Sequence, residues 1–82
     1  MNTHITVFGP GCANCVRLDK EVHKALAATG INGTVTKVTD YADIAAAGVT
    51  ATPGLMINGE LLVTGRVPKA QEIGELLTRY SK

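Results

Sequence analysis

The spacing of apolar residues along the chain predicts an alternation of strands and helices. Residues 4–8 are β-branched and aromatic and are followed at once by Gly-Pro-Gly, which predicts a buried strand with a sharp end. After Ala13 the apolar side chains recur at helical spacing as far as Gly30, at Cys15, Leu18, Val22, Ala25 or Leu26, and Thr29. The polar residues Asp19, Lys20, Glu21 and Lys24 fall on the other sides of this predicted helix.

The rest of the chain contains five further elements. Residues 34–39 alternate valine with threonine and lysine, which predicts a second strand, and Asp40 is the expected N-cap of a short helix over 41–47. We expect Tyr41, at the start of this helix, to pack on the sheet. The apolar triplets 55–57 and 61–63 flank Asn58-Gly59-Glu60, a hairpin signal because Asn and Gly both tolerate positive φ. Pro68 then opens a last helix with an apolar stripe at Ala70, Ile73, Leu76, Leu77 and Tyr80.

The predicted order is therefore βαβαββα. Two strand–helix–strand units imply parallel strands, and the hairpin adds antiparallel ones. The expected fold is α/β, with a mixed four-stranded sheet and three helices. No repeat or linker interrupts the pattern, so residues 1–82 are expected to form a single domain.

Composition narrows the function classes. The chain has 82 residues, 45% of them apolar, which suffices for one modest core. The formal charge is +1 with no run of like charges, which argues against a nucleic-acid partner. No stretch approaches the roughly 20 apolar residues that span a bilayer. The first residues do not show the basic segment followed by an apolar one that is typical of a signal peptide. We therefore expect a cytoplasmic protein with no membrane association.

The two cysteines, Cys12 and Cys15, form a Cys-Ala-Asn-Cys motif where the first strand gives way to the first helix. Structural disulfides are rare in a reducing compartment, and so short a loop would remove little entropy from the unfolded chain, so the pair is expected to serve chemistry. A thiolate at Cys12 would be stabilised by the start of the helix. Cys15 lies on the apolar stripe and is expected to face the core. We therefore assign Cys12 as the nucleophile and Cys15 as the resolving cysteine.

The same cysteine spacing also serves as half of a zinc site, which needs four ligands. The other candidates are His4, His23 and the carboxylates, and both histidines fall away from the motif. We expect neither a bound metal nor a cofactor.

The stretch from Gly9 to Cys15, followed later by Gly48-Val49-Thr50-Ala51-Thr52-Pro53, resembles the thioredoxin/glutaredoxin superfamily. Within it, the short length and the Gly-Pro-Gly-Cys sequence resemble the small thioredoxin-like redox-active disulfide proteins of bacteria and archaea. The resemblance implies a thioredoxin-like fold and dithiol exchange with disulfide-containing protein substrates. It also implies a thioredoxin-reductase-type or other dithiol electron donor, and we expect a monomer.

The resemblance further implies that the Thr52–Pro53 peptide bond is cis and lies beside the dithiol. The residues expected to form the substrate-binding groove are Gly11, Ala13, Asn14, Ala51, Thr52, Pro53 and Gly65.

The chain departs from the patterns typical of the proteins that it resembles. It has Gly11 where ordinary thioredoxins carry a tryptophan, and Ala13-Asn14 between the cysteines. Thioredoxins also carry a buried acid on the strand that leads to the site, where this chain offers only Thr6, so proton transfer from Cys15 needs water or another group. Residues 64–67 lack the Gly-Gly-acid pattern with which glutaredoxins bind glutathione, which argues against dedicated glutathione use.

Two alternative functions stay open on the sequence. Copper-type carrier domains have a similar length and a CxxC motif before a helix, but their motif is led by Met-Thr and their element order is βαββαβ. A non-catalytic module could instead use the same fold to bind a partner, in which case the cysteines would be dispensable.

Overall fold

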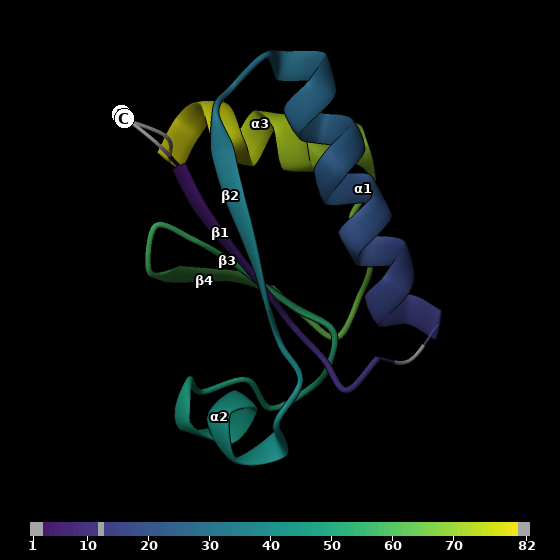
Figure 1. Ribbon diagram of the computed structural model, residues 1–82, viewed down its shortest axis with the longest axis vertical. Coiled ribbons are helices and arrows are strands. Elements are labelled where there is room, and N and C mark those ends of the chain that lie inside the picture. Colours follow the sequence, from purple (N-terminus) through teal and green to yellow (C-terminus); the bar gives the residue numbers. More distant parts are fainter. Residues whose placement is uncertain (1–2, 12, 81–82) are drawn as a thin grey trace.

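The computed structural model describes residues 3–11 and 13–80. In this part of the chain the elements follow one another as β1 (Thr3–Phe8), α1 (Ala13–Thr29), β2 (Gly33–Val38), α2 (Tyr41–Ala46), β3 (Gly54–Ile57), β4 (Glu60–Thr64) and α3 (Ala70–Tyr80) (Figure 1). The predicted order βαβαββα is confirmed, and most element boundaries agree within one residue. The last helix begins at Ala70, two residues after Pro68.

The four strands form one mixed sheet in the order β2-β1-β3-β4. Strand β1 pairs parallel with β2 and antiparallel with β3, and β3 pairs antiparallel with β4. The turn between β3 and β4 is Asn58-Gly59, and both residues have positive φ, 51° and 85°. The hairpin predicted from this dipeptide is confirmed.

The expectation of two parallel strand–helix–strand units is wrong for the second unit, because β3 runs antiparallel to β1 and hence to β2. The connection explains the difference. Helix α2 has only six residues and lies beyond the end of the sheet at which β2 stops, not alongside the strands (Figure 1). The chain therefore does not return to the start of the sheet, and β3 begins at the end where β2 stops.

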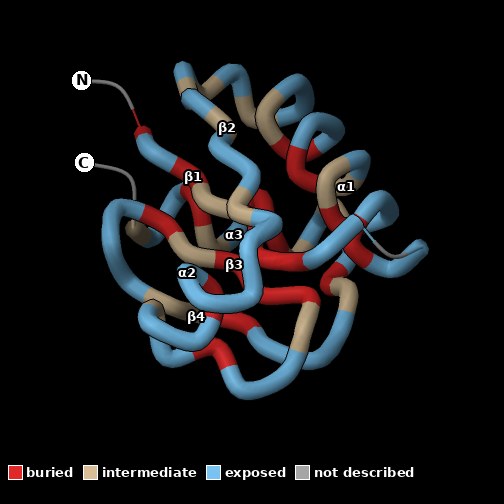
Figure 2. The backbone as a smooth tube through the Cα atoms, turned by 60° about the horizontal axis from the view of Figure 1, so that its bottom comes forward, coloured by how far each residue is buried: buried red, intermediate tan, exposed pale blue. Residues whose placement is uncertain are grey.

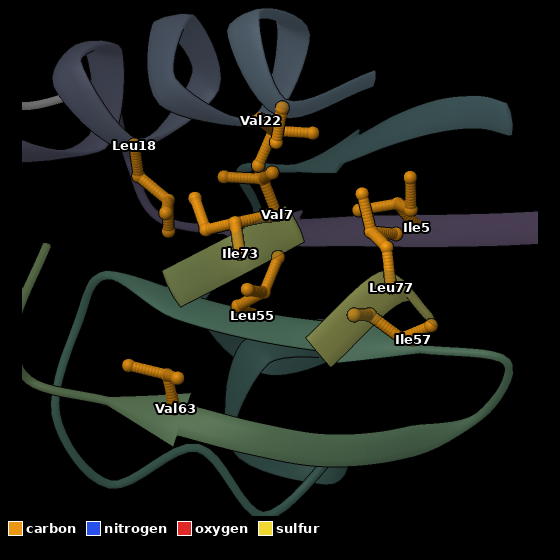
Figure 3. Close-up of a cluster of buried hydrophobic side chains, with 10 residues drawn as sticks. Ile5, Val7, Leu18, Val22, Leu55, Ile57, Val63, Ile73 and Leu77 are labelled. Carbon is orange, nitrogen blue, oxygen red and sulfur yellow. The ribbon is translucent and has the colours of Figure 1, made fainter. Parts of the chain in front are cut away.

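The main core lies between the sheet and helices α1 and α3. Figure 3 shows Leu18 and Val22 of α1, with Ile73 and Leu77 of α3, meeting side chains of the sheet. The two helices also touch closely, since a Cβ on Gly74 of α3 would lie 3.3 Å from Thr29 Cγ2 of α1. This layer fixes the orientation of α1, whose first turn carries Cys15.

A smaller cluster covers the opposite face of the sheet. It contains Phe8, Ile44 of α2 and Val49. Asp40 caps α2 as predicted, its side chain accepting a hydrogen bond from Ala42 N at 2.8 Å. The prediction that Tyr41 packs on the sheet is wrong: it is 71% exposed, because Ile44 is the residue of α2 that reaches the sheet.

Burial is greatest along the two central strands. Figure 2 shows the buried residues concentrated in β1, β3 and the inner side of α1, while β2 alternates between exposed and half-buried positions. None of the helices in the described part of the chain has the length and apolar character needed to cross a bilayer.

Candidate active site

The turn between β1 and α1 is built from glycines that let the chain pass close to the helix. Gly9 is buried, and its N–H donates to Val38 O at 2.9 Å, so the backbone still pairs with β2 one residue beyond β1. Gly11 has φ 92°, in the left-handed region that glycine adopts without strain. Cys12 lies outside the described residues and directly precedes the first residue of α1 in the sequence.

Cys15 lies in the first turn of α1 and is buried, with 6% of its surface exposed. Its side chain covers Gly9 so closely that a Cβ at Gly9 would overlap the Cys15 sulfur. Ala13 and Asn14 are exposed. The burial of Cys15 agrees with its place on the apolar stripe of α1.

A second group of predicted site residues lies in the loop before β3. The Thr52–Pro53 peptide bond is cis, Pro53 is buried and Thr52 is half-buried. Gly65 N–H donates to Pro53 O at 2.9 Å, and a Cβ on Gly65 would lie 3.2 Å from Ala51 Cβ. Ala51, Pro53 and Gly65 are thus brought together.

The two groups lie at the same end of the sheet. Phe8, the last residue of β1, is the register partner of Gly54, the first residue of β3. Gly9 follows Phe8, and Pro53 precedes Gly54. The loop after β1 and the loop before β3 therefore lie side by side at this end of the sheet (Figure 1).

A small cavity of about 60 Å³ adjoins Cys15. Its walls come from the end of β1, the first turns of α1 and the end of β2: Val7, Gly9, Gly11, Cys15, Val16, Asp19, Lys37 and Thr39. The Ala51, Pro53 and Gly65 group is not part of this lining. Two larger open hollows, of about 880 and 440 Å³, lie between α1 and α3 and beside Arg17 and Lys69, and neither is lined by a cysteine.

Asp19 and Lys37 bring opposite charges to the cavity. Asp19 Oδ2 lies 3.1 Å from Lys37 Nζ, and the Asp19 side chain is only 17% exposed. Asp19 Oδ1 is buried and has no hydrogen-bond partner in the described part of the chain. His23 Nε2 comes within 3.4 Å of this oxygen without hydrogen-bond geometry, and it forms an ion pair there only when protonated.

Sequence reasoning missed Asp19, which it placed on the polar side of the first helix. The signal that could have found it is its spacing, since residues four apart lie on the same face of a helix and Asp19 follows Cys15 by four. Lys37 carried no local signal, because its approach to Asp19 depends on the pairing of β2 with β1.

A second carboxylate, the partly buried Glu21, supports the position of α1. Glu21 Oε1 accepts a hydrogen bond from Ala70 N at 2.9 Å, at the start of α3, and Lys24 Nζ lies 3.2 Å from Glu21 Oε2. The hydrogen bond from Ala70, followed by that from Lys24, holds the pKa of Glu21 below its usual 4.5. Within residues 3–11 and 13–80, no three His, Cys, Asp or Glu side chains are grouped as a metal site requires.

Comparison with known proteins gives consistent matches across the chain. The family described as Thioredoxin domain matches residues 3–78. A thioredoxin from Methanothermobacter thermautotrophicus is 40% identical over 74 residues, covering 90% of this chain and 96% of the relative. A thioredoxin from Methanocaldococcus jannaschii is 37% identical over 76 residues, covering 93% of this chain and 87% of the relative.

Two solved structures have a similar fold. A malarial protein superposes with a TM-score of 0.74 at 15% identity, over the whole of both chains. Thioredoxin-2, described as a component of the malaria parasite protein secretion machinery, superposes with a TM-score of 0.71 at 16% identity, covering 95% of this chain and 82% of its own. At these identities the likeness is one of fold.

Proposed function

Because this chain belongs to the thioredoxin domain family, we propose that it is a small thiol–disulfide oxidoreductase that works through Cys12 and Cys15. The expected superfamily and the thioredoxin-like α/β fold are confirmed by these relatives and by the solved structures. The observation that carries the proposal is the burial of Cys15 in the first turn of α1, three residues after a second cysteine.

The proposed reaction has two exchange steps. The thiolate of Cys12 attacks a substrate disulfide, forming a mixed disulfide and releasing one substrate thiolate, which takes up a proton. Cys15 then loses its proton and attacks the Cys12 sulfur, which forms the Cys12–Cys15 disulfide and releases the second substrate thiol. The place of Cys12 directly before α1 favours its thiolate, because the start of a helix stabilises negative charge.

The substrate is proposed to be a protein disulfide in an extended segment. The loop residues Ala51, Thr52 and Pro53, with Gly65, lie at the same end of the sheet as the turn that contains Gly11, and Ala13 and Asn14 are exposed beside it. We propose that these residues form the binding groove. A thioredoxin-reductase-type or other dithiol donor would return electrons to the site, in a single-domain, monomeric, cytoplasmic protein without a cofactor.

Single-cysteine variants test the assignment of roles. Incubated with a protein disulfide, Cys15→Ser should accumulate a mixed disulfide through Cys12, because the resolving thiol is missing. Cys12→Ser should trap nothing, and the double variant provides the background. The products are identified by mass after blocking unreacted thiols. Trapping through Cys15 would reverse the roles.

The reduction potential of the pair separates this function from the alternatives. We expect a single two-electron transition between roughly −200 and −300 mV in defined thiol–disulfide buffers. A pair that never closes within the chain, together with tight stoichiometric copper(I) binding, would favour a metal carrier. The βαβαββα order differs from the βαββαβ order of such carriers. Retention of function without either cysteine would favour a non-catalytic interaction module.

A further inference from the structure

The cavity beside Cys15 contains a carboxylate that the exchange reaction, as described so far, does not use. Asp19 lies one turn after Cys15 on α1, and both side chains line the same space of about 60 Å³. Side chains four residues apart on a helix are neighbours. The space is large enough for a water molecule, and among its mostly apolar walls Asp19, Lys37 and Thr39 offer that water polar partners.

The two oxygens of Asp19 have different surroundings. Lys37 Nζ is 3.1 Å from Oδ2, while Oδ1 is buried and accepts no hydrogen bond from the described residues. A buried oxygen that lacks a protein partner is costly and uncommon in folded proteins, so such a group calls for a functional explanation. Lys37 thus fixes the carboxylate and leaves Oδ1 as the oxygen that can accept a proton.

We propose that Asp19, held in place by Lys37, accepts the proton of the Cys15 thiol through a water molecule in this cavity during the resolving step. This inference rests on the proposed function. The Cys15 S–H bond breaks and its proton passes to the water, which gives a proton to Asp19 Oδ1. The Cys15 sulfur bonds to the Cys12 sulfur, the bond from Cys12 to the substrate breaks, and the substrate leaves as a thiolate. Asp19 then returns the proton to solvent, from which the thiolate is protonated.

The charges around Asp19 are compatible with this role. Lys37 from β2 and His23 from α1 are the charged or titratable side chains near its oxygens in the described part of the chain, and both are 59% exposed. Among the described residues, β1 contributes the apolar Val7 to the cavity, and the turn after it contributes Gly9 and Gly11. A carboxylate is a weaker base than a thiolate in water, so the proton moves as the new sulfur–sulfur bond forms and removes the thiolate. Asp19 therefore acts on the proton of Cys15 through the water molecule.

A two-step reagent separates the resolving step from the first attack. When the reduced protein reacts with dithiobis(nitrobenzoate), the first thionitrobenzoate is released by the attacking cysteine. The second is released when the other cysteine closes the disulfide. Stopped-flow absorbance records both phases in the same trace, across a range of pH.

The test variant is Asp19→Asn, which keeps the size of the side chain and cannot accept the proton. At neutral pH we expect the second phase to slow roughly 10- to 100-fold, within the range of acid–base catalysis, and the first phase to change less than about threefold. The two proteins should converge well above pH 8.5, the ordinary thiol pKa, because Cys15 then ionises unaided. Glu75→Gln, an exposed carboxylate on α3, is the matched control and should leave both phases unchanged.

A second variant keeps the proposal testable if Asp19→Asn folds poorly. Lys37→Gln keeps the acceptor and removes its ion pair, so it should slow the second phase less than Asp19→Asn does. Equal second phases in Asp19→Asn and the parent at every pH would overturn the role of Asp19 while leaving the oxidoreductase intact. A constant slowing without convergence at high pH would mean that Asp19 is structural, which also overturns it. If the parent protein shows no second phase, the two cysteines do not form a disulfide. That result would contradict the proposed function and this inference together.

Discussion

Gly9 is the residue whose replacement tests the geometry of the site most directly. It follows β1, donates its N–H to Val38 O at 2.9 Å, and lies under the side chain of Cys15. Its φ is not positive, so the backbone itself accepts an alanine. A Cβ at this position would overlap Cys15 Sγ and lie 3.0 Å from Cys15 Cβ. In Gly9→Ala the sulfur must therefore move.

The size of the effect follows from that overlap. Non-bonded carbon and sulfur atoms normally stay about 3.5–4 Å apart, so the sulfur must shift by about 1 Å or more. Cys15 is 6% exposed and has little free space into which to move. Overpacking of this kind costs about 1–3 kcal/mol, and the lower entropy of an unfolded chain with alanine returns less than about 1 kcal/mol. We expect a net loss of about 1–2 kcal/mol in the free energy of unfolding.

The assay pairs urea unfolding under reducing conditions with the two-phase thionitrobenzoate release. Since a displacement of 1 Å can cost roughly 100-fold in rate, the second phase of Gly9→Ala should slow by that order. Cys15→Ala provides the matched background for a double-mutant cycle, because it removes the sulfur and leaves only the milder contact of 3.0 Å to the Cβ of residue 15. Most of the destabilisation should disappear in this background. An equal cost of Gly9→Ala with and without the sulfur would refute the packing argument.

Two further predictions concern stability. The hydrogen bond from Ala70 N, with Lys24, lowers the pKa of Glu21, so the charged carboxylate stabilises the folded state above pH 4.5 and loses this contribution as the pH falls through the folded-state pKa. Glu21→Gln should therefore melt lower than the parent at pH 7, with the gap closing below pH 4.5; a gap independent of pH would contradict this. Leu77 is fully buried in the main core, and Leu77→Ala should cost about 2–5 kcal/mol in urea unfolding. The half-buried Leu76→Ala should cost less, and equal costs would count against the packing described.

The elements that the sequence predicted well are those fixed by local chemistry. Gly59 adopts positive φ because it has no Cβ, and Asn58 does so because its short polar side chain tolerates that region. Asp40 caps α2 through a hydrogen bond with a residue two positions away. The burial of Cys15 follows from helical periodicity, which is equally local. These signals need no knowledge of the rest of the fold.

The features that the sequence did not predict depend on distant parts of the chain. The direction of β3 depends on how far the six residues of α2 carry the chain, which no motif encodes. The surroundings of Asp19 depend on Lys37, which reaches it from β2 through the pairing of β2 with β1. An acidic residue on a helix is ordinarily solvated, so its pattern alone favours the surface.

The sheet also explains where an acid can serve Cys15 in this chain. Thr6, the polar residue considered on the strand, lies on the face opposite to α1, since Ile5 and Val7 on either side of it belong to the main core. The position of β1 that lines the Cys15 cavity is Val7, which is 3% exposed among apolar side chains. A carboxylate there would be buried among hydrocarbon and costly. On α1, one turn from Cys15, Asp19 retains 17% exposure and an ion pair with Lys37. A carboxylate on the helix can thus lie beside the resolving thiol at a smaller desolvation cost than a carboxylate on the strand. This difference is why we assign Asp19 as the acceptor of the Cys15 proton.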